Sequence, residues 1–395
     1  MNSNFIKPKY DRDGFVNIIP AIQESLVSQK YDAVVLFLID GFGCRFVDKF
    51  QSESFLSEVL KNGEYRKYTS QFPSTTTVHI TTLHTGQTVG EHGFYEWFYY
   101  EPEIDKVISP LLFSPAGISE RDFLKKDGVK PRKIFPQNDF YHSLRRQGVF
   151  TTIFQHHEYT PSSYGNIFFD GAQSIGYKTL SEALINLTLG LSNSPSPSYF
   201  ILYYEKIDSI SHEYGPQSPQ VEAEIKNFLL SMKMIFLKNI SGNKKKVLFL
   251  LTADHGQADV DPKTTVYLNI DPRFSGIERF IKKNKNGGLL VPCGSARDFF
   301  LHIEEDKIPD AMDILSRGLK DKADVRMVSE MIDQGYFGHT ISDRFRERIG
   351  NLVILPYNHE SVWWFEKNKF EQRFYGHHGG LTRHEMEIPL ITWEL

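Results

Sequence analysis

The feature of this sequence that most constrains its fold is the apolar run YDAVVLFLIDG, from Tyr31 to Gly41. It is rich in β-branched and aromatic residues and has no polar face, so a strand here must be buried on both sides, as in a parallel sheet covered by helices. Apolar runs that end in acidic residues recur at SYFILYYEKID (Ser198–Asp208) and KKVLFLLTADHG (Lys245–Gly256). We therefore expect several buried parallel strands.

Segments with the apolar spacing of helices lie between these runs. They are PQNDFYHSLRRQG (136–148), LSEALINLTLGLS (180–192) and SPQVEAEIKNFLLSMKMIFLKNI (218–240). Strands that alternate with helices indicate βαβ units. The sequence thus predicts an α/β fold with a mostly parallel central sheet and helices on both of its faces.

The alternation stops between about Asp259 and Tyr375. This segment contains ARDFFLHIE, PDAMDILSRGLKDK and VRMVSEM, which predict a small β-α-β set. The closing stretch GHHGGLTRHEMEIPLITWEL then ends in a pattern typical of a last strand. A length of 395 residues suits a large α/β domain with an inserted lobe. We predict a main domain of residues 1–258 and 376–395, and an inserted α+β cap lobe of residues 259–375.

Charge and composition exclude several classes of protein. Lysine plus arginine (45) nearly balance aspartate plus glutamate (49), and no basic face that would bind duplex nucleic acid stands out. The first residues lack the apolar core of a secretory signal, and no apolar run reaches the ~18 residues of a membrane span. We expect a cytoplasmic protein without a membrane segment, although removal of a leader would leave the same pattern. No feature specifies the oligomeric state.

The three strongest apolar runs end in the same kinds of side chain. These are Asp40, then Asp208 and His212, then Asp254 and His255. Each alone has an ordinary explanation, such as an Asp-Gly turn or a helix cap. Because sites in parallel α/β sheets form at the carboxyl ends of the strands, all five should meet at one edge.

Carboxylates mixed with imidazoles suit zinc or a neighbouring metal such as manganese. Five ligands exceed the three, plus water, of one catalytic zinc, and they are too few for two metals. A sixth ligand should therefore exist. The glycine-rich YGHHGGLT offers His377 and His378.

The stretch FPSTTTVHITTLHTG (Phe72–Gly86) places three threonines at the expected start of a helix. Two metals about 3.5–4 Å apart can clamp the attacking and leaving oxygens of an in-line displacement at phosphorus. A metal-bound threonine hydroxyl loses its proton easily, and a helix N-terminus favours negative charge. Helix capping is the alternative, but three consecutive threonines exceed what a cap requires. We expect one of them to be a nucleophile.

In this order, LIDGFG, FPSTTTVHITTLHTGQTVGEHG, YYEKIDSISHEYGP, LLTADHG and HHGGLTRHEMEIPLI resemble motifs of the alkaline phosphatase superfamily. Within it they are most similar to the type I phosphodiesterase/nucleotide pyrophosphatase family, and they frame nearly the whole chain. The resemblance implies an alkaline-phosphatase-like catalytic domain and two divalent metal ions, most often zinc. It further implies hydrolysis of a small phosphodiester, nucleotide or pyrophosphate substrate through a phosphothreonine intermediate.

The resemblance also implies roles for individual residues. One metal would be held by Asp208, His212 and His378, and the other by Asp40, Asp254, His255 and the nucleophile. We choose His378 over His377 because the family's ligand directly precedes a glycine. We choose Thr76 over Thr75 and Thr77 because it lies nine residues before Thr85 of the TG pair.

The sequence departs from the family at Trp97. Eukaryotic members have an asparagine near this place that helps to hold the phosphate, so Trp97 is expected to contact the substrate instead. The sulfatase modification motif is not found, which disfavours a sulfatase. The extra arginine and magnesium set of the alkaline phosphatases is not found either, which favours diesters over monoesters. The alternatives are a phosphomonoesterase, phosphonate hydrolase or phosphotransferase of the same superfamily, or a non-catalytic metal-binding relative.

Overall fold

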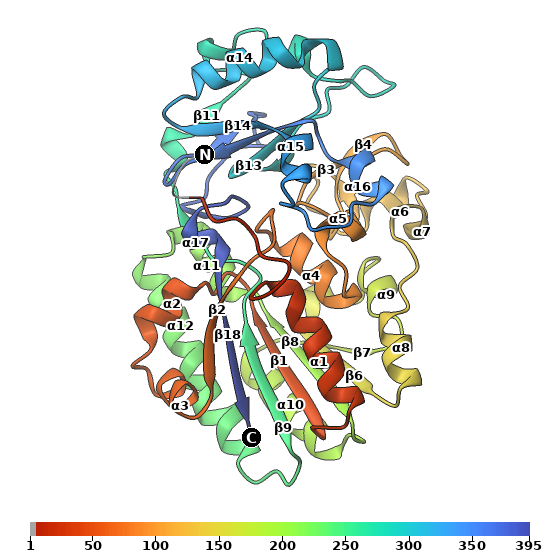
Figure 1. Cartoon of the computed structure of the whole chain (residues 1–395), viewed down its shortest axis with the longest axis vertical. Helices are drawn as coiled ribbons and strands as arrows, with labels where there is room; N and C mark the ends of the chain where they lie inside the picture. The colour runs from red at the N-terminus through yellow and green to blue at the C-terminus, as the bar shows by residue number, and fades with distance from the viewer. Residues whose placement is uncertain (1–4) are drawn as a thin grey trace.

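Seven strands form the central sheet, and the five in its middle and at one edge run parallel (Figure 1). The computed structural model describes residues 5–395. In spatial order the strands are β2 (Glu64–Thr69), β18 (Glu387–Glu394), β9 (Val247–Thr252), β1 (Ala33–Ile39), β8 (Ser198–Tyr204), β6 (Phe150–His156) and β7 (Gln173–Tyr177). Strand β18 pairs antiparallel with both β9 and β2. The predicted mostly parallel sheet is confirmed.

Strand β1 lies at the centre of this sheet, and all seven of its residues are buried. Its parallel neighbours are β8 and β9, so that Leu36 lies opposite both Ile201 and Leu250. Residues on both faces of β1 therefore contact the hydrophobic core. This explains why the run from Tyr31 to Gly41 has no polar face.

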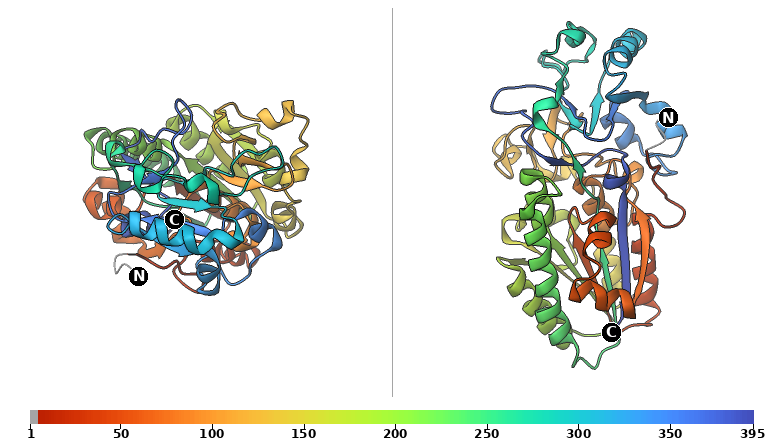
Figure 2. Two further views of the ribbon diagram at one scale, coloured as in Figure 1. Left: turned by 90° about the horizontal axis from the view of Figure 1, so that it is seen from above. Right: turned by 90° about the vertical axis from the view of Figure 1, so that its left-hand side faces the viewer.

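Helices cover both faces of the sheet, as the right-hand view of Figure 2 shows. The predicted helix at 180–192 is α10 (Leu180–Asn193), and the one at 218–240 is α12 (Pro219–Ser231), a π-helical stretch (Met232–Leu237) and α13 (Lys238–Ile240). The helix predicted at 136–148 is shorter, α8 (Phe140–Arg146). The remaining helices of this part are α1 (Ile18–Val27), α2 (Cys44–Phe50), α3 (Ser54–Asn62), α4 (Thr76–Thr85), α5 (Val89–His92), α6 (Phe123–Lys126), α7 (Pro131–Ile134), α9 (Gly165–Phe168), α11 (Lys206–Tyr214) and α17 (Arg383–Met386).

A second, antiparallel sheet lies beyond the upper end of the first in Figure 1. Its strands, in spatial order, are β12 (Cys293–Ser295), β13 (Asp298–Leu301), β15 (Leu352–Pro356) and β14 (Ala323–Met327). The helices α14 (Ile308–Gly318), α15 (Val328–Asp333) and α16 (Asp343–Arg348) belong to the same part of the chain. The segment leaves through β10 (Ala258–Asp259) and returns through β17 (Gly376–His377), which pair with each other. The proposed lobe boundaries stay a prediction.

Five further short strands form two smaller sheets. The strands β3 (Tyr99–Glu101), β4 (Lys106–Ser109) and β5 (Ser114–Pro115) form a small antiparallel sheet, and β11 (Val266–Tyr267) pairs with β16 (Val362–Trp363). Cys44 and Cys293 are both buried and unbridged. No helix within residues 5–395 combines the length and the apolar character needed to cross a membrane.

Candidate active site

The register of the sheet brings three acidic residues to one edge. Ile39 of β1 lies opposite Tyr204 of β8, and Leu38 lies opposite Thr252 of β9, so the three strands end at the same level. Asp40 and Asp254 follow β1 and β9, and Asp208 lies in the first turn of α11 after β8. The backbone therefore places these three acidic residues at the same edge of the sheet.

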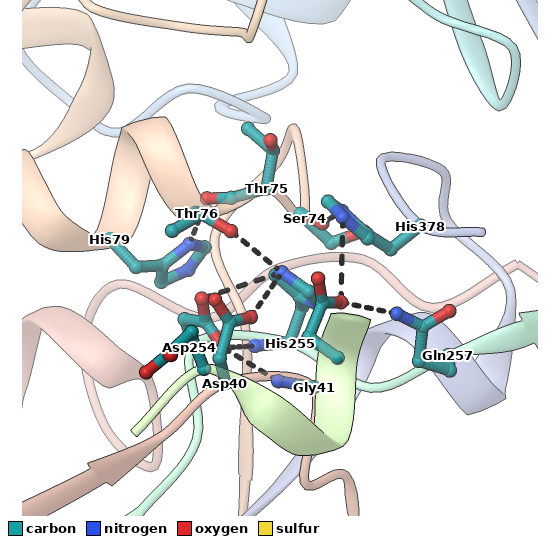
Figure 3. Close-up of polar contacts among 12 residues, drawn as sticks. Asp40, Gly41, Ser74, Thr75, Thr76, His79, Asp254, His255, Gln257 and His378 are labelled. Atoms are coloured by element: carbon teal, nitrogen blue, oxygen red, sulfur yellow. Dashed lines mark hydrogen bonds and ion pairs between the residues drawn. The ribbon is translucent and has the colours of Figure 1, made fainter. Parts of the chain in front are cut away.

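Asp40, Asp254 and His255 form the first cluster (Figure 3). Nε2 of His255 lies 3.3 Å from Oδ1 of Asp40 and 3.3 Å from Oδ2 of Asp254. All three side chains are buried, and these two carboxylate oxygens have no hydrogen-bond partner among the described residues. Buried polar atoms without partners are rare in proteins, and these three residues could hold a cation.

Asp208, His255 and His378 form the second cluster beside the first, and His212 contacts Asp208. Asp208 and His212 are one turn apart on α11, with Oδ2 and Nε2 separated by 3.3 Å. Nε2 of His378, from the loop before α17, lies 3.8 Å from Oδ1 of Asp208. His255 joins the two clusters, because its ring stacks on that of His378 with centroids 3.6 Å apart.

The orientation of the three imidazoles supports metal binding. In each, Nδ1 lies within hydrogen-bonding distance of a backbone carbonyl: Gly256 for His255 (3.0 Å), Gly376 for His212 (2.8 Å) and Ser74 for His378 (3.0 Å). A carbonyl can only accept, so Nδ1 carries a proton, and in the neutral ring Nε2 then presents a lone pair. These lone pairs face carboxylate oxygens, which also carry lone pairs. A cation between them removes the conflict.

The charges of the cluster lead to the same conclusion. Burial raises the pKa of Asp40 well above its usual range, and the neighbouring Asp254 and Asp208 raise it further. Burial also raises the pKa of Asp254. Burial opposes ionisation of Asp208 too, but His212 and His378 outweigh it and lower its pKa. Within residues 5–395, no lysine or arginine forms an ion pair with any of the three carboxylates. Two divalent cations would compensate this charge.

Thr76 begins α4 directly beside the first cluster (Figure 3). Its Oγ1 lies 3.2 Å from Nε2 of His255. Thr75 is the extended residue before the helix, and its carbonyl lies 2.8 Å from Nδ1 of His79, which fixes this turn. Thr75 and Thr77 are buried, whereas Thr76 is partly exposed to the adjoining cavity. The geometry favours Thr76, whose role stays a prediction.

Trp97 and His377 also reach this cavity, which has a volume of about 520 Å³. Trp97 is 36 % exposed and lies on the wall together with Phe98, Phe370 and Phe374. His377 lines the cavity too, but it forms no ion pair with a carboxylate in the part of the chain that the structure describes. The preference for His378 over His377 therefore has a geometric basis.

Sequence reasoning missed three residues of this region. Tyr203 lies in the apolar run that forms β8, and its hydroxyl donates a hydrogen bond to Oδ2 of Asp40 and orients that carboxylate. Glu96 and Asp298 are both fully buried and adjoin each other next to Thr75. Burial raises the pKa of Glu96 to about 8 and that of Asp298 well above its usual range. The one signal in the sequence for these residues was the position of Glu96 within the aromatic stretch FYEWFYY.

The raised pKa of Glu96 predicts that the stability of the folded protein depends on pH. Its folded-state pKa is about 8, raised by burial, so between the ordinary value and 8 the folded protein holds a proton that the unfolded chain has lost. Stability contributed by this group therefore falls as the pH rises through that range. Glu96→Gln needs no proton, and we expect its unfolding temperature to decline less than that of the wild type between pH 5 and 9. Scanning fluorimetry would measure this. The exposed Glu103→Gln is the matched control, and parallel curves for Glu96→Gln and the wild type would contradict the assignment.

Comparison with known proteins agrees with this geometry. The family model described as "Type I phosphodiesterase / nucleotide pyrophosphatase" matches residues 34–381. A venom phosphodiesterase of Crotalus durissus collilineatus is 25 % identical over 246 residues, which are 60 % of this chain and 27 % of that protein. The human ectonucleotide pyrophosphatase/phosphodiesterase family member 1 is 24 % identical over 246 residues, which are 60 % of this chain and 24 % of the human protein. The matched region thus spans about a quarter of these relatives.

Solved structures show the same fold. Murine ectonucleotide pyrophosphatase/phosphodiesterase 5, as an inactive threonine-to-alanine variant in complex with AMP, superposes with a TM-score of 0.67. It is 17 % identical, and the match covers 91 % of this chain and 87 % of the murine chain. The human protein of the same name gives a TM-score of 0.67 at 15 % identity, with the same coverage. At these identities the likeness concerns the fold.

Proposed function

The chain belongs to the type I phosphodiesterase/nucleotide pyrophosphatase family, and from this premise we propose that it hydrolyses phosphodiester or pyrophosphate bonds of small molecules with the help of two divalent metal ions. The observation that carries the proposal is the position of His255 Nε2 against the unpartnered buried oxygens of Asp40 and Asp254, beside the Thr76 hydroxyl. The Nε2 atoms of His212 and His378 lie against Asp208 in the same way. The structural neighbour that binds AMP and is inactive after a threonine-to-alanine exchange supports both a nucleotide-like substrate and an essential threonine.

The residues present fit two metal ions of the zinc or manganese type. Asp208, His212 and His378 would hold one ion, and Asp40, Asp254, His255 and Thr76 would hold the other. The donor set of oxygen and imidazole ligands, with Nδ1 of each histidine occupied by a carbonyl, matches the usual preferences of zinc. When bound, the ions would lower the pKa of a coordinated hydroxyl and offset negative charge on the phosphoryl oxygens.

Thr76 is the nucleophile in this proposal. Its Oγ1 forms a bond to phosphorus as the bond from phosphorus to the leaving oxygen breaks, which gives a phosphothreonine. Water then attacks the same phosphorus and releases Thr76. The first N–H groups of α4 have no partner within the helix, so they are available to the phosphoryl oxygens. Trp97 would contact the retained part of the substrate from the cavity wall.

Substrate preference tests the proposal. A monoester dianion carries one more negative charge than a diester, and the carboxylates of the cluster have no lysine or arginine in ion-pair range among the residues described. We expect the zinc-loaded enzyme to hydrolyse thymidine 5′-monophosphate p-nitrophenyl ester with a kcat/KM at least about tenfold above that for p-nitrophenyl phosphate, a difference of about 1.4 kcal/mol. A preference for the monoester would instead indicate a phosphomonoesterase. No turnover with two metals bound would indicate a non-catalytic relative.

A further inference from the structure

Arg121 lines the same cavity as Thr76 and four of the proposed metal ligands, Asp40, Asp208, His212 and His378, although it comes from a different part of the sequence. It precedes α6 and is only partly exposed to solvent. Its guanidinium carbon lies 5.5 Å from the centroid of the Tyr159 ring, and one of its N–H groups donates to the carbonyl of Leu111 at 2.7 Å. The stack and the hydrogen bond hold the side chain in a fixed position at the wall.

The positive charge of Arg121 has no partner of opposite charge. Within residues 5–395, no carboxylate lies at ion-pair distance from it, and the Leu111 carbonyl accounts for one of its five N–H donors. The adjacent Asp122 is engaged elsewhere, by Lys125 at 2.8 Å and by the backbone N–H of Ser163 at 3.1 Å. Burial lowers the pKa of the guanidinium, which shows that desolvation outweighs the attraction of its acidic neighbours.

The two fully buried arginines and the other cation of the cavity wall are compensated. The fully buried Arg297 and Arg348 pair with Glu385 and Glu101, respectively. Among the residues that line the cavity, Lys369 is the other lysine or arginine. It pairs with Glu366 at 3.3 Å. A desolvated cation without a counter-charge is costly, and arginine is the residue best suited to hold planar anions through two N–H groups. The missing partner of Arg121 is therefore expected to come from a ligand.

The position of Tyr159 connects this cation to the reaction centre. Burial raises the pKa of the Tyr159 hydroxyl, and the charges of Glu205, Asp40 and Arg121 all act on it. The Tyr159 ring contacts Arg121 on one side, and its centroid lies 6.3 Å from that of Tyr203, whose hydroxyl donates to Asp40. The neighbouring wall is largely apolar and is formed by Ile80, Leu111, Tyr164 and Phe169.

We propose that Arg121 binds a second anionic group of the substrate, a phosphate or a carboxylate, in the part that stays bound while the phosphodiester bond is cleaved. This rests on the proposed hydrolytic function of the same cavity. Arg121 would then select substrates that carry an anion in addition to the reacting phosphoryl group. Neutral diesters of equal size would be bound without this contribution.

The test uses p-nitrophenyl phosphodiesters of aliphatic alcohols that end in a hydroxyl, a carboxylate or a phosphate, each with a two-carbon and a four-carbon chain. For the zinc-loaded wild type we expect a kcat/KM at least about tenfold higher for an anionic ester than for the hydroxyl ester of the same length. The kcat/KM values of the phosphate ester and the carboxylate ester then show which anion is preferred.

Variants of Arg121 show whether this residue causes the preference. We expect Arg121→Met to reduce kcat/KM for the preferred anionic ester at least about tenfold more than for the hydroxyl ester, and Arg121→Lys to keep part of the preference. Lys126→Met is the matched control, because Lys126 belongs to the same α6 segment but pairs with Glu120 at the surface. It should leave the preference unchanged. Equal rates for charged and neutral esters in the wild type, or an equal loss on both esters in Arg121→Met, would overturn the proposal.

Binding distinguishes failure of this proposal from failure of the proposed function. If the wild type cleaves none of the esters, the hydrolytic assignment fails, and calorimetric titration of zinc-loaded Thr76→Ala with the phosphate and hydroxyl esters then decides the role of Arg121. Binding of the phosphate ester at least about tenfold tighter, abolished in the Thr76→Ala/Arg121→Met double variant, supports an anion site. Equal affinities for the two esters overturn it.

Discussion

Replacement of Thr76 by alanine is expected to lower kcat on thymidine 5′-monophosphate p-nitrophenyl ester by at least about 10⁴-fold, the scale seen when a covalent nucleophile is removed. The hydroxyl of Thr76 lies at the start of α4, beside both carboxylates of the first cluster, and is the one of the three consecutive threonine hydroxyls that contacts His255. Water alone would have to attack phosphorus in the variant. Thr76→Ser keeps a hydroxyl in place and should retain measurable activity.

The neighbouring threonines provide matched controls for this prediction. Thr75 is buried and hydrogen-bonds to Glu96, and Thr77 is buried with its hydroxyl unpartnered among the described residues. We expect Thr75→Ala and Thr77→Ala to change kcat by less than about tenfold, because neither hydroxyl reaches the cluster. Initial rates under metal-saturated conditions would measure all four variants. A loss in Thr75→Ala as large as that in Thr76→Ala would move the nucleophile to residue 75.

The central sheet and the carboxylate edge were predictable from sequence because their signals are local. A strand buried on both faces needs a continuous apolar run, and the residue after the run lies at the strand end whatever the rest of the fold does. Asp40 and Asp254 follow directly from this rule. Asp208 and His212 follow from the four-residue spacing of one helical turn, which the structure realises in α11.

The parts of the site that were missed depend on contacts between distant segments. Glu96 and Asp298 come from segments far apart in the sequence, and nothing near either residue indicates that the other will adjoin it. Arg121 is an ordinary charged residue in the sequence, and its lack of a counter-charge becomes visible only when its surroundings are known. The short strands β3, β4 and β5 carry too few residues for a periodic pattern to indicate them.

Removal of the metals is expected to destabilise the protein as well as to abolish its activity. Binding to the folded state alone contributes about 2.7 kcal/mol per site at a metal concentration of 100 times Kd. Without metals, Asp40 and Asp254 have raised pKa values, because burial disfavours ionisation of both and the negative charge of Asp208 acts on each of them. The stability of the metal-free protein should therefore fall as the pH rises from the ordinary carboxyl range through these raised values.

Because the metal-free protein loses stability as the pH rises, the effect of metal removal on stability should depend on pH. Metal ligands must be deprotonated, so protons compete with the metals at low pH, whereas at high pH the metals remove the repulsion between the carboxylates. The difference in unfolding temperature between zinc-loaded and chelated protein should be larger at pH 8 than at pH 5, as measured by calorimetry.

Asp40→Asn removes one buried charge, so its chelated form should be more stable at pH 8 than the chelated wild type. Asp259→Asn, which alters an acidic residue paired with Arg45 outside the cluster, should leave the metal-dependent difference unchanged. An unfolding temperature that is the same with and without zinc at pH 8 would show that the carboxylates and imidazoles do not hold a metal.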